Sequence, residues 1–300
     1  MANATDASRV EPDPNAPLPW QARISRLISD RGVRVTSDVA FADHPRLKCD
    51  IYEPERDVPA HAPVAHFIYG GRWDTGEKAC YRAIGAALAS RGIRTVIGDY
   101  RLYPDVQFPE PNRDMAAAYA FTANRFGRDA PPPVIIGHSA GAHIGALLVG
   151  DKRYFDALPA PPPRPSAFVG LAGPYAFDPT TWDTTAAMFA STRDDPDRAR
   201  PIAFADATFP PSLLLHGRRD DIVTPNASEL FHDALLANGH NVSLKLYTWL
   251  NHVTVVMAMA RPLRWVTPVL GDVAAFVETH AVASPRAGAP PKTAEVAPSA

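Results

Sequence analysis

The sequence predicts an α/β protein whose sheet is mostly parallel. Short runs rich in Val, Ile and Leu alternate with longer segments of helical period, as in chains whose helices connect parallel strands. The chain of 300 residues is 46% hydrophobic and 21% charged, so it can bury a large core. Its centre contains no long linker, which favours one main domain.

Eight segments have the composition of strands. The first two alternate polar with apolar residues and are close in the chain, so we expect them to form a hairpin at one edge of the sheet. The later segments are denser in branched apolar residues, as expected for strands covered on both faces. The predicted strands are 33–41, 46–53, 63–69, 93–99, 133–137, 166–171, 211–216 and 242–248.

Helical periodicity fills most of the intervals between these strands. The predicted helices are 20–31, 77–91, 111–126, 140–150, 226–238 and about 265–280. We expect the main domain to span 20–282, between a flexible N-terminal segment of residues 1–19 and a disordered, Pro-rich tail of residues 283–300. Segment 173–210 is too long for a simple connection and carries aromatic residues and short helical pieces, so it is predicted to form a small cap or lid.

Charge and composition favour a small-molecule partner. The formal net charge is −2 and charged residues are spread along the chain, which argues against nucleic acid or an anionic membrane as the partner. No stretch approaches about eighteen consecutive apolar residues, and the N-terminus lacks the features of a signal peptide, so we expect a cytoplasmic protein. The chain's two cysteines, Cys49 and Cys80, suggest neither a disulfide framework nor a metal site.

Residues 134–150 contain the most informative motif. A short apolar strand runs into Gly137-His138-Ser139-Ala140-Gly141 and then into a helix, which is the strand–turn–helix context of a G-x-S-x-G nucleophile elbow. A serine on so sharp a turn has a strained backbone, and a side chain at either glycine would collide with the adjacent strand or helix. The start of the following helix also favours an anion forming beside the serine. We therefore predict that Ser139 is a nucleophile.

A serine hydroxyl needs a histidine as base, and the chain has ten histidines. Catalytic groups of an open α/β sheet gather at the carboxyl ends of its strands. His252 directly follows the eighth predicted strand and meets this requirement, whereas His240 precedes that strand and falls at the opposite edge. We expect structural, hydrogen-bonded roles for His138 and His143 near the serine, and we expect His216 to support the loop that carries the acid.

The acid that orients the base is expected in the loop after the seventh predicted strand. Asp220 and Asp221 both lie there, and the chain order Ser, Asp, His is the one expected for hydrolases of this class. Spacing alone does not decide which of the two aspartates is the acid.

An oxyanion needs backbone N–H donors near the serine. Gly70 and Gly71 follow the third predicted strand, and Ala140 directly follows Ser139. We expect the N–H groups of these three residues to stabilise the oxyanion.

Five segments between residues 64 and 256 carry the motifs of a known family. They are YGGRW at 69–73, GDYRLYP at 98–104, GHSAGAH at 137–143, VGLAGPY at 169–175 and LLLHGRRDDIV at 213–223. With these motifs the chain resembles the α/β-hydrolase superfamily, and within it the carboxylesterase and arylformamidase-like branch related to hormone-sensitive lipase, of BD-FAE type. The resemblance implies an eight-stranded, mostly parallel sheet flanked by helices, with a small cap.

The resemblance also assigns roles to individual residues. It makes Asp220 the acid, because Val223 follows it at the spacing of the family motif, and it makes His252 the base of Ser139. Trp73 is implied to line the acyl pocket.

One residue departs from the family pattern. Tyr69 stands where the family has a histidine. The hydrogen bonds that shape the oxyanion loop, meaning residues 69–73 with the expected donors Gly70 and Gly71, must therefore differ. Tyr69 is expected beside the substrate pocket, and the unusual Arg72 is a candidate contact for a substrate carboxylate.

The expected activity is hydrolysis of small-molecule carboxylic esters through an acyl-enzyme, with no metal and no organic cofactor. The same machinery also suits an arylformamidase acting on N-formylkynurenine, and the sequence does not separate ester from amide. A ligand-binding relative without catalysis is the remaining alternative. A metal site formed by His216, Asp220 and His252 has no supporting motif.

Overall fold

The computed structural model describes residues 31–127, 129–261, 263–265 and 267–281. Within them, eight strands form one sheet in the order β1-β2-β4-β3-β5-β6-β7-β8. The predicted fold class, α/β with a mostly parallel sheet, is confirmed. The strands are β1 Val33–Ala40, β2 Lys48–Pro54, β3 Val64–Ile68, β4 Arg94–Gly98, β5 Val134–His138, β6 Phe168–Leu171, β7 Ser212–Gly217 and β8 Val242–Tyr247.

The described residues do not include the two ends of the chain. Segment 1–19, nearly all of the predicted helix 20–31 and the tail 283–300 lie outside the described residues. The flexible, helical and disordered states predicted for them remain predictions.

Strands β1 and β2 form the expected antiparallel hairpin at one edge of the sheet, and β2 also runs antiparallel to β4. All other neighbours are parallel. The burial of the strands follows this topology, because β1 is largely exposed whereas every residue of β3, β4 and β5 is buried. These central strands are covered on both faces, which explains their unbroken apolar composition.

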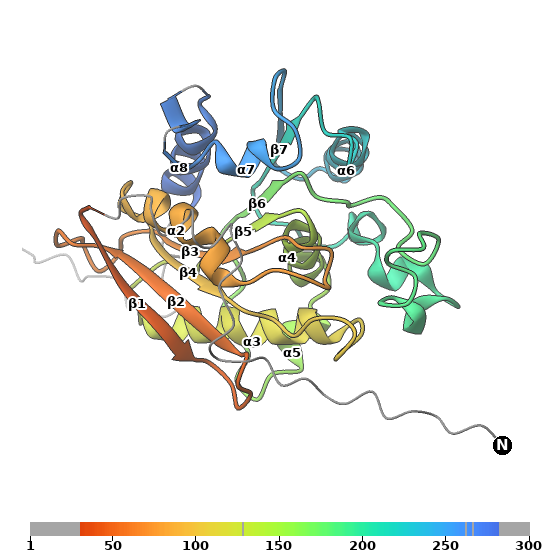
Figure 1. The fold of residues 1–300 in the computed structure, drawn as a ribbon, viewed down its shortest axis with the longest axis horizontal. Helices are drawn as coiled ribbons and strands as arrows, with labels where there is room; N and C mark the ends of the chain where they lie inside the picture. The colour runs from red at the N-terminus through yellow and green to blue at the C-terminus, as the bar shows by residue number, and fades with distance from the viewer. Residues whose placement is uncertain (1–30, 128, 262, 266, 282–300) are drawn as a thin grey trace, which may run out of the picture.

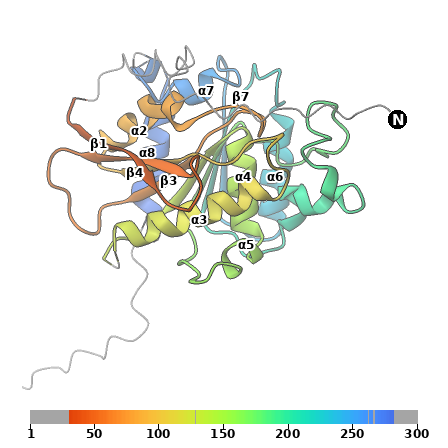
Figure 2. The same cartoon turned by 60° about the horizontal axis from the view of Figure 1, so that its bottom comes forward.

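Helices lie on both faces of the sheet (Figure 1). α2 contacts α8 above the sheet in this view, and α3 runs along the opposite face with α5 (Figure 2). The α-helices are α2 Arg82–Ala89, α3 Glu110–Arg125, α4 Ala140–Gly150, α5 Arg153–Asp156, α6 Asn226–Ala237, α7 Thr254–Met257 and α8 Val269–His280. The 3-10 helices are η1 Lys78–Tyr81, η2 Ala190–Thr192, η3 Pro196–Ala199, η4 Pro201–Phe204 and η5 Leu263–Trp265.

Two predicted helices differ from the observed ones. The segment 77–91 is divided into η1 and α2, and the segment 265–280 becomes helical only at Val269. The second difference has a steric cause, because Pro268 disfavours helical backbone at the residue before it and so stands at the N-cap of α8.

Helix α4 lies at the centre of the fold, and all 11 of its residues are buried. It packs against β3, β5 and β6, so an apolar surface all round suits it. A bilayer span needs about twenty residues. Among the described residues, no helix is both long and apolar enough for that purpose.

The segment 173–210 winds over one end of the molecule, shown in green to teal in Figure 1. Its expected short helical pieces are the 3-10 turns η2, η3 and η4. η4 packs against α4 and α6, which joins the segment to the central layer of the fold.

Candidate active site

Ser139 occupies a sharp turn between β5 and α4. Its backbone has φ 54° and ψ −122°, a conformation that residues with a side chain rarely adopt and that is retained where function requires it. A Cβ atom on Gly137 would lie 2.4 Å from the Gly141 carbonyl oxygen, and one on Gly141 would lie 2.1 Å from the Ile68 carbonyl oxygen. Both glycines are therefore required by close backbone approach, as the motif predicts.

Ser139 takes part in a continuous chain of hydrogen bonds. His252 Nε2 lies 2.8 Å from Ser139 Oγ, and His252 Nδ1 lies 2.8 Å from Asp220 Oδ2. An ionised carboxylate only accepts, so Nδ1 carries the imidazole proton and Nε2 is left to accept from the serine hydroxyl. This tautomer is the one that a base of Ser139 needs.

Asp220 is held in the loop after β7 by four hydrogen bonds. Its Oδ1 accepts from the N–H groups of Ile222 and Val223, at 3.0 and 2.9 Å, and its Oδ2 accepts from His216 and His252. Burial alone would raise the pKa of the Asp220 carboxyl, but the hydrogen bonds from His216, His252 and Val223 hold it well below its usual range. Asp220 stays ionised, whereas Asp221 is exposed; the structure brings Asp220 to the base.

His216 supports the acid loop, as expected. Its Nε2–H lies 3.0 Å from Asp220 Oδ2 and 2.8 Å from the Val223 carbonyl oxygen, and its Nδ1 lies 2.7 Å from Ser228 Oγ. Because Nε2 faces only acceptors, it carries the ring proton, and Nδ1 accepts from the serine hydroxyl. The buried ring thereby fixes the position of the Asp220 carboxylate.

The other two histidines near the elbow are also hydrogen-bonded. His138 Nε2 contacts the backbone carbonyl of His252 at 2.9 Å, and His143 Nε2 contacts that of Ala199 at 2.7 Å. Burial lowers the pKa of His138 to about 3 and that of His143 to about 4, so both rings are neutral at physiological pH. Their expected structural roles are consistent with these contacts.

The loop after β3 reaches Ser139 because β3 and β5 are adjacent parallel strands that end at the same edge of the sheet. A Cβ atom on Gly70 would lie 2.8 Å from Ser139 Cβ. The Gly70 N–H donates to the Tyr81 hydroxyl at 3.2 Å. By contrast, Gly71 N–H has no partner within the described parts of the chain, and Ala140 N–H has no intrahelical acceptor because it begins α4.

Tyr69 is not placed as expected. Its side chain is fully buried and presents no surface to a ligand. The ring is stacked on those of Tyr81 and Tyr100, and its hydroxyl donates to Asp99 Oδ1 at 2.9 Å and accepts from Arg46. Tyr69 therefore supports the loop after β3 from the core, and its assignment to the substrate pocket is corrected.

Arg72 and Trp73 both have positive φ angles, of 49° and 63°, which turn the chain away from β3. The Arg72 side chain is exposed and pairs with Asp74 at 3.2 Å. Trp73 is buried, with its ring 4.9 Å from that of Phe189 in an edge-on contact and 6.3 Å from that of Phe177. Trp73 thus joins the loop after β3 to segment 173–210 through an aromatic cluster.

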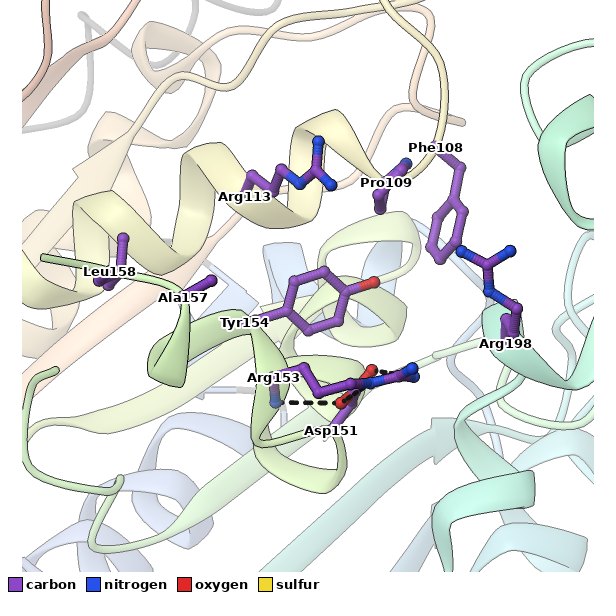
Figure 3. A pocket seen from close by; sticks show the side chains of 9 residues that line it. All are labelled: Phe108, Pro109, Arg113, Asp151, Arg153, Tyr154, Ala157, Leu158 and Arg198. Carbon is purple, nitrogen blue, oxygen red and sulfur yellow. Dashed lines mark hydrogen bonds and ion pairs between the residues drawn. The ribbon is translucent and has the colours of Figure 1, made fainter.

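A cavity of about 480 Å³ lies elsewhere, between the start of α3 and the chain around α5 (Figure 3). It begins near Asp151, at the far end of α4 from Ser139, and a helix of that length spans about 16 Å. Among the arginines that line it, Arg153 is paired with Asp151 at 2.7 Å, and Arg113 is paired with Glu110. The cavity contains none of the residues around Ser139.

Tyr81 was not among the residues predicted from the sequence. This residue lies at the end of η1, and its hydroxyl is within 3.2 Å of Gly70 N and 3.1 Å of His138 Nδ1. No sequence signal identifies it, because a tyrosine in a helical segment ordinarily packs in the core. The contact of His138 with the His252 backbone was also not foreseen.

Two family models match the chain. The BD-FAE model matches residues 49–158, and the model described as the prolyl oligopeptidase family matches residues 110–279, more than half of the chain. Together they span the loop after β3, Ser139, Asp220 and His252.

Curated relatives are similar to this chain at low identity. A probable isoprenylcysteine alpha-carbonyl methylesterase, ICMEL1 from Arabidopsis thaliana, is 26% identical over 271 residues, which cover 79% of this chain and 56% of the relative. Esterase LipC from Mycobacterium tuberculosis is 28% identical over 66% of this chain and 54% of its own length. The chain thus spans about half the length of the curated relatives it matches.

Solved structures show the same fold. Esterase B from Lactobacillus rhamnosis, inhibited by a tributyrin phosphonate, has a TM-score of 0.75 at 19% identity, covering 87% of this chain and 91% of that one. A hormone-sensitive lipase from a metagenome library has a TM-score of 0.68 at 18% identity, with the same coverage of 87% and 91%. The solved structures share the α/β-hydrolase fold, and the chain belongs to the prolyl oligopeptidase family, whose model matches more than half of it, while the BD-FAE model matches residues 49–158.

Proposed function

We propose that this protein is a serine hydrolase that cleaves carboxylic esters of small molecules. The observation that carries the proposal is the hydrogen-bond chain from Ser139 Oγ through His252 to Asp220, with 2.8 Å at each step. The names of similar proteins support it, since they include methylesterases, esterases and a carboxylic ester hydrolase.

In the acylation step, Ser139 Oγ attacks the ester carbonyl carbon while His252 Nε2 takes the hydroxyl proton. The resulting imidazolium is stabilised by the Asp220 carboxylate, which accepts from Nδ1. Because its hydrogen bonds hold the pKa of Asp220 well below its usual range, this carboxylate keeps its charge and leaves the proton on the imidazole.

The negative charge that forms on the carbonyl oxygen needs donors placed in advance. Ala140 offers the N–H group that directly follows Ser139, Gly71 in the loop after β3 offers an N–H without a partner among the described residues, and the start of α4 adds a favourable dipole. The Gly70 N–H was also expected to donate to the oxyanion, but it donates to the Tyr81 hydroxyl. It would become an oxyanion donor only if that hydroxyl moved. Loss of one such donor typically lowers the rate by about 10²- to 10³-fold.

The tetrahedral intermediate collapses when His252 returns the proton to the leaving alcohol. Water then attacks the acyl-enzyme, with His252 acting as base a second time, and Ser139 is released. Every proton in this cycle passes through the Nε2 atom of His252, so the proposed cycle requires no metal and no organic cofactor.

The cluster of Trp73, Phe177 and Phe189 is apolar, and Trp73 belongs to the loop after β3, so we propose that these rings line the acyl pocket. Segment 173–210 supplies two of these rings, which is why we propose that it acts as a cap. Arg72 stands exposed at the end of the oxyanion loop, where it could contact a substrate carboxylate. The near-neutral charge of the chain favours a small-molecule substrate over nucleic acid or an anionic membrane; the cytoplasmic location remains a prediction of the sequence.

Parallel assays with short p-nitrophenyl esters and with N-formylkynurenine test this proposal. We expect ester hydrolysis that is lost in S139A, and little deformylation. A formamidase activity far above the esterase activity would replace the ester proposal with an arylformamidase. Absence of both activities in the wild-type protein would favour a ligand-binding protein.

A further inference from the structure

A second chain of hydrogen bonds runs behind Ser139 and ends on the backbone of the base. The Gly70 N–H donates to the Tyr81 hydroxyl oxygen at 3.2 Å, and that oxygen lies 3.1 Å from His138 Nδ1. His138 Nε2 lies 2.9 Å from the carbonyl oxygen of His252. Residues on four separate segments are thereby connected, from the loop after β3 to the base.

The direction of each hydrogen bond in this second chain is determined by its ends. The His252 carbonyl oxygen only accepts, so His138 Nε2 carries the ring proton and Nδ1 of the neutral ring accepts. The Tyr81 hydroxyl therefore donates to His138 Nδ1, because the alternative acceptor, the Gly70 carbonyl oxygen, lies at 3.5 Å. Its oxygen is then free to accept from Gly70 N–H. Hydrogen bonds that point one way along a buried chain strengthen one another.

The side chains of this second chain have little freedom to move. His138 is buried, and the Tyr81 ring packs against those of Phe67 and Tyr69, at centroid distances of 5.6 Å for both. The position of Tyr81 therefore determines where the His138 ring lies, and His138 in turn holds the His252 carbonyl.

We propose that Tyr81 and His138 are positioning residues, which hold the backbone of His252 in register with the oxyanion loop so that Nε2 faces Ser139. This inference rests on the proposed ester hydrolysis. Asp220 orients the His252 imidazole through Nδ1, and the N–H groups of Arg218 and Arg219 hold the carbonyls of Tyr247 and Leu250, but none of these contacts holds the backbone of His252 itself. The His138 contact fixes the loop at the base itself, and small misplacement of a reacting group costs about 10²-fold in rate.

The electrostatics of His138 agree with this role. Its ring centroid lies 5.2 Å from that of His252, which becomes positively charged during the proposed reaction. Burial, and next the neighbouring charge of His252, lower the pKa of His138 to about 3, so it stays neutral beside the imidazolium. A positively charged residue at this position would oppose proton transfer to His252.

Three substitutions test the individual hydrogen bonds of this second chain of hydrogen bonds. Y81F removes only the hydroxyl. H138N retains an amide near the place of Nδ1 but loses the donor to the His252 carbonyl, whereas H138Q places its amide N–H near Nε2 and keeps that donor. Y119F is the matched control, because it removes another buried tyrosine hydroxyl, which donates to the Pro163 carbonyl oxygen at 3.1 Å.

The test measures kcat, KM and melting temperature for these variants with a p-nitrophenyl ester. We expect H138N, which loses the donor to the His252 carbonyl, to lower kcat about 10- to 100-fold with KM changed less than about twofold. Y81F and H138Q each break only the hydrogen bond between Tyr81 and His138, so both should lower kcat by a smaller and similar amount, about 3- to 10-fold. Y119F should match the wild type. The loss of kcat in the Y81F/H138N double variant should be no larger than in the worse single variant, because both residues act through the same series of hydrogen bonds.

Wild-type kcat in Y81F, or equal losses of kcat in H138N and H138Q, would overturn the proposal. Y81F decides the question by itself if the His138 variants do not fold, because it adds no atom and leaves the ring contacts intact. Wild-type and S139A proteins measured alongside separate this outcome from failure of the proposed function, which would appear as an inactive wild type.

Discussion

His252 Nδ1 lies 2.8 Å from Asp220 Oδ2, although 32 positions separate the two residues in the chain. The contact arises from topology, because β7 and β8 are adjacent parallel strands and each residue lies in the loop that follows one of them. Ser139 follows β5 at the same edge. Three loops thus bring together the groups that the proposed reaction requires.

The first prediction concerns the choice of acid. D220N should lower kcat about 10⁴-fold with a small change in KM, because an amide can impose the wrong tautomer on His252. D221N is the matched control, since Asp221 is exposed, and it should keep kcat within about threefold. Steady-state kinetics on one ester substrate compare the two. Equal losses in both variants would show that the assignment of Asp220 is wrong.

The second prediction concerns the close approach at the elbow. G141A should destabilise the protein by about 1–3 kcal/mol and remove most of the esterase activity, because the added methyl group would lie 2.1 Å from the Ile68 carbonyl oxygen. G271A is the control, in which nothing lies within 4 Å of the added methyl group in α8. It should raise the free energy of unfolding by about 0.5–1 kcal/mol.

Urea unfolding and esterase assays of both glycine variants make this comparison. A G141A protein with wild-type stability and wild-type kcat would contradict the structure of the turn.

The third prediction concerns stability against pH. Burial lowers the pKa of His66 and His138 to about 3 and that of His143 to about 4, below the ordinary value of 6.5. The unfolded chain therefore binds more protons than the folded one below pH 6.5, and the free energy of unfolding falls as pH falls. The slope should be about 1 kcal/mol per pH unit for each histidine between pH 6.5 and 4.

Urea unfolding at pH 7.5, 6 and 5 measures this slope. The exposed His61 provides a control, because H61Q should leave the slope unchanged. A free energy of unfolding that stays constant from pH 7.5 to 5 would be inconsistent with three neutral, buried histidines.

The sequence predicted all eight strands because their apolar runs are short, dense and separated by clear helical periods. The sequence also predicted the sharp turn at Ser139, since the close backbone approach at this turn requires both Gly137 and Gly141. The pairing of Asp220 with His252 was harder to predict from the sequence. Two adjacent aspartates differ only in side-chain direction at the end of β7, and the family motif was needed to choose between them.

Tyr69 and Tyr81 show where sequence reasoning fails. Tyr69 occupies a position of the family motif, but its side chain turns into the core to reach Asp99 and Arg46, which are distant in the chain. The role of Tyr81 depends on Gly70 and His138, which lie 11 and 57 positions away. Such contacts are products of the folded structure and leave no local pattern.

The proposed function requires Ser139 to be the nucleophile of an ester hydrolase. Incubation with a fluorophosphonate, followed by peptide mass spectrometry, identifies the nucleophile. We expect one covalent adduct on Ser139, formed in parallel with loss of esterase activity, and no adduct in S139A. An adduct on another residue, or an active protein that the reagent does not modify, would contradict this assignment.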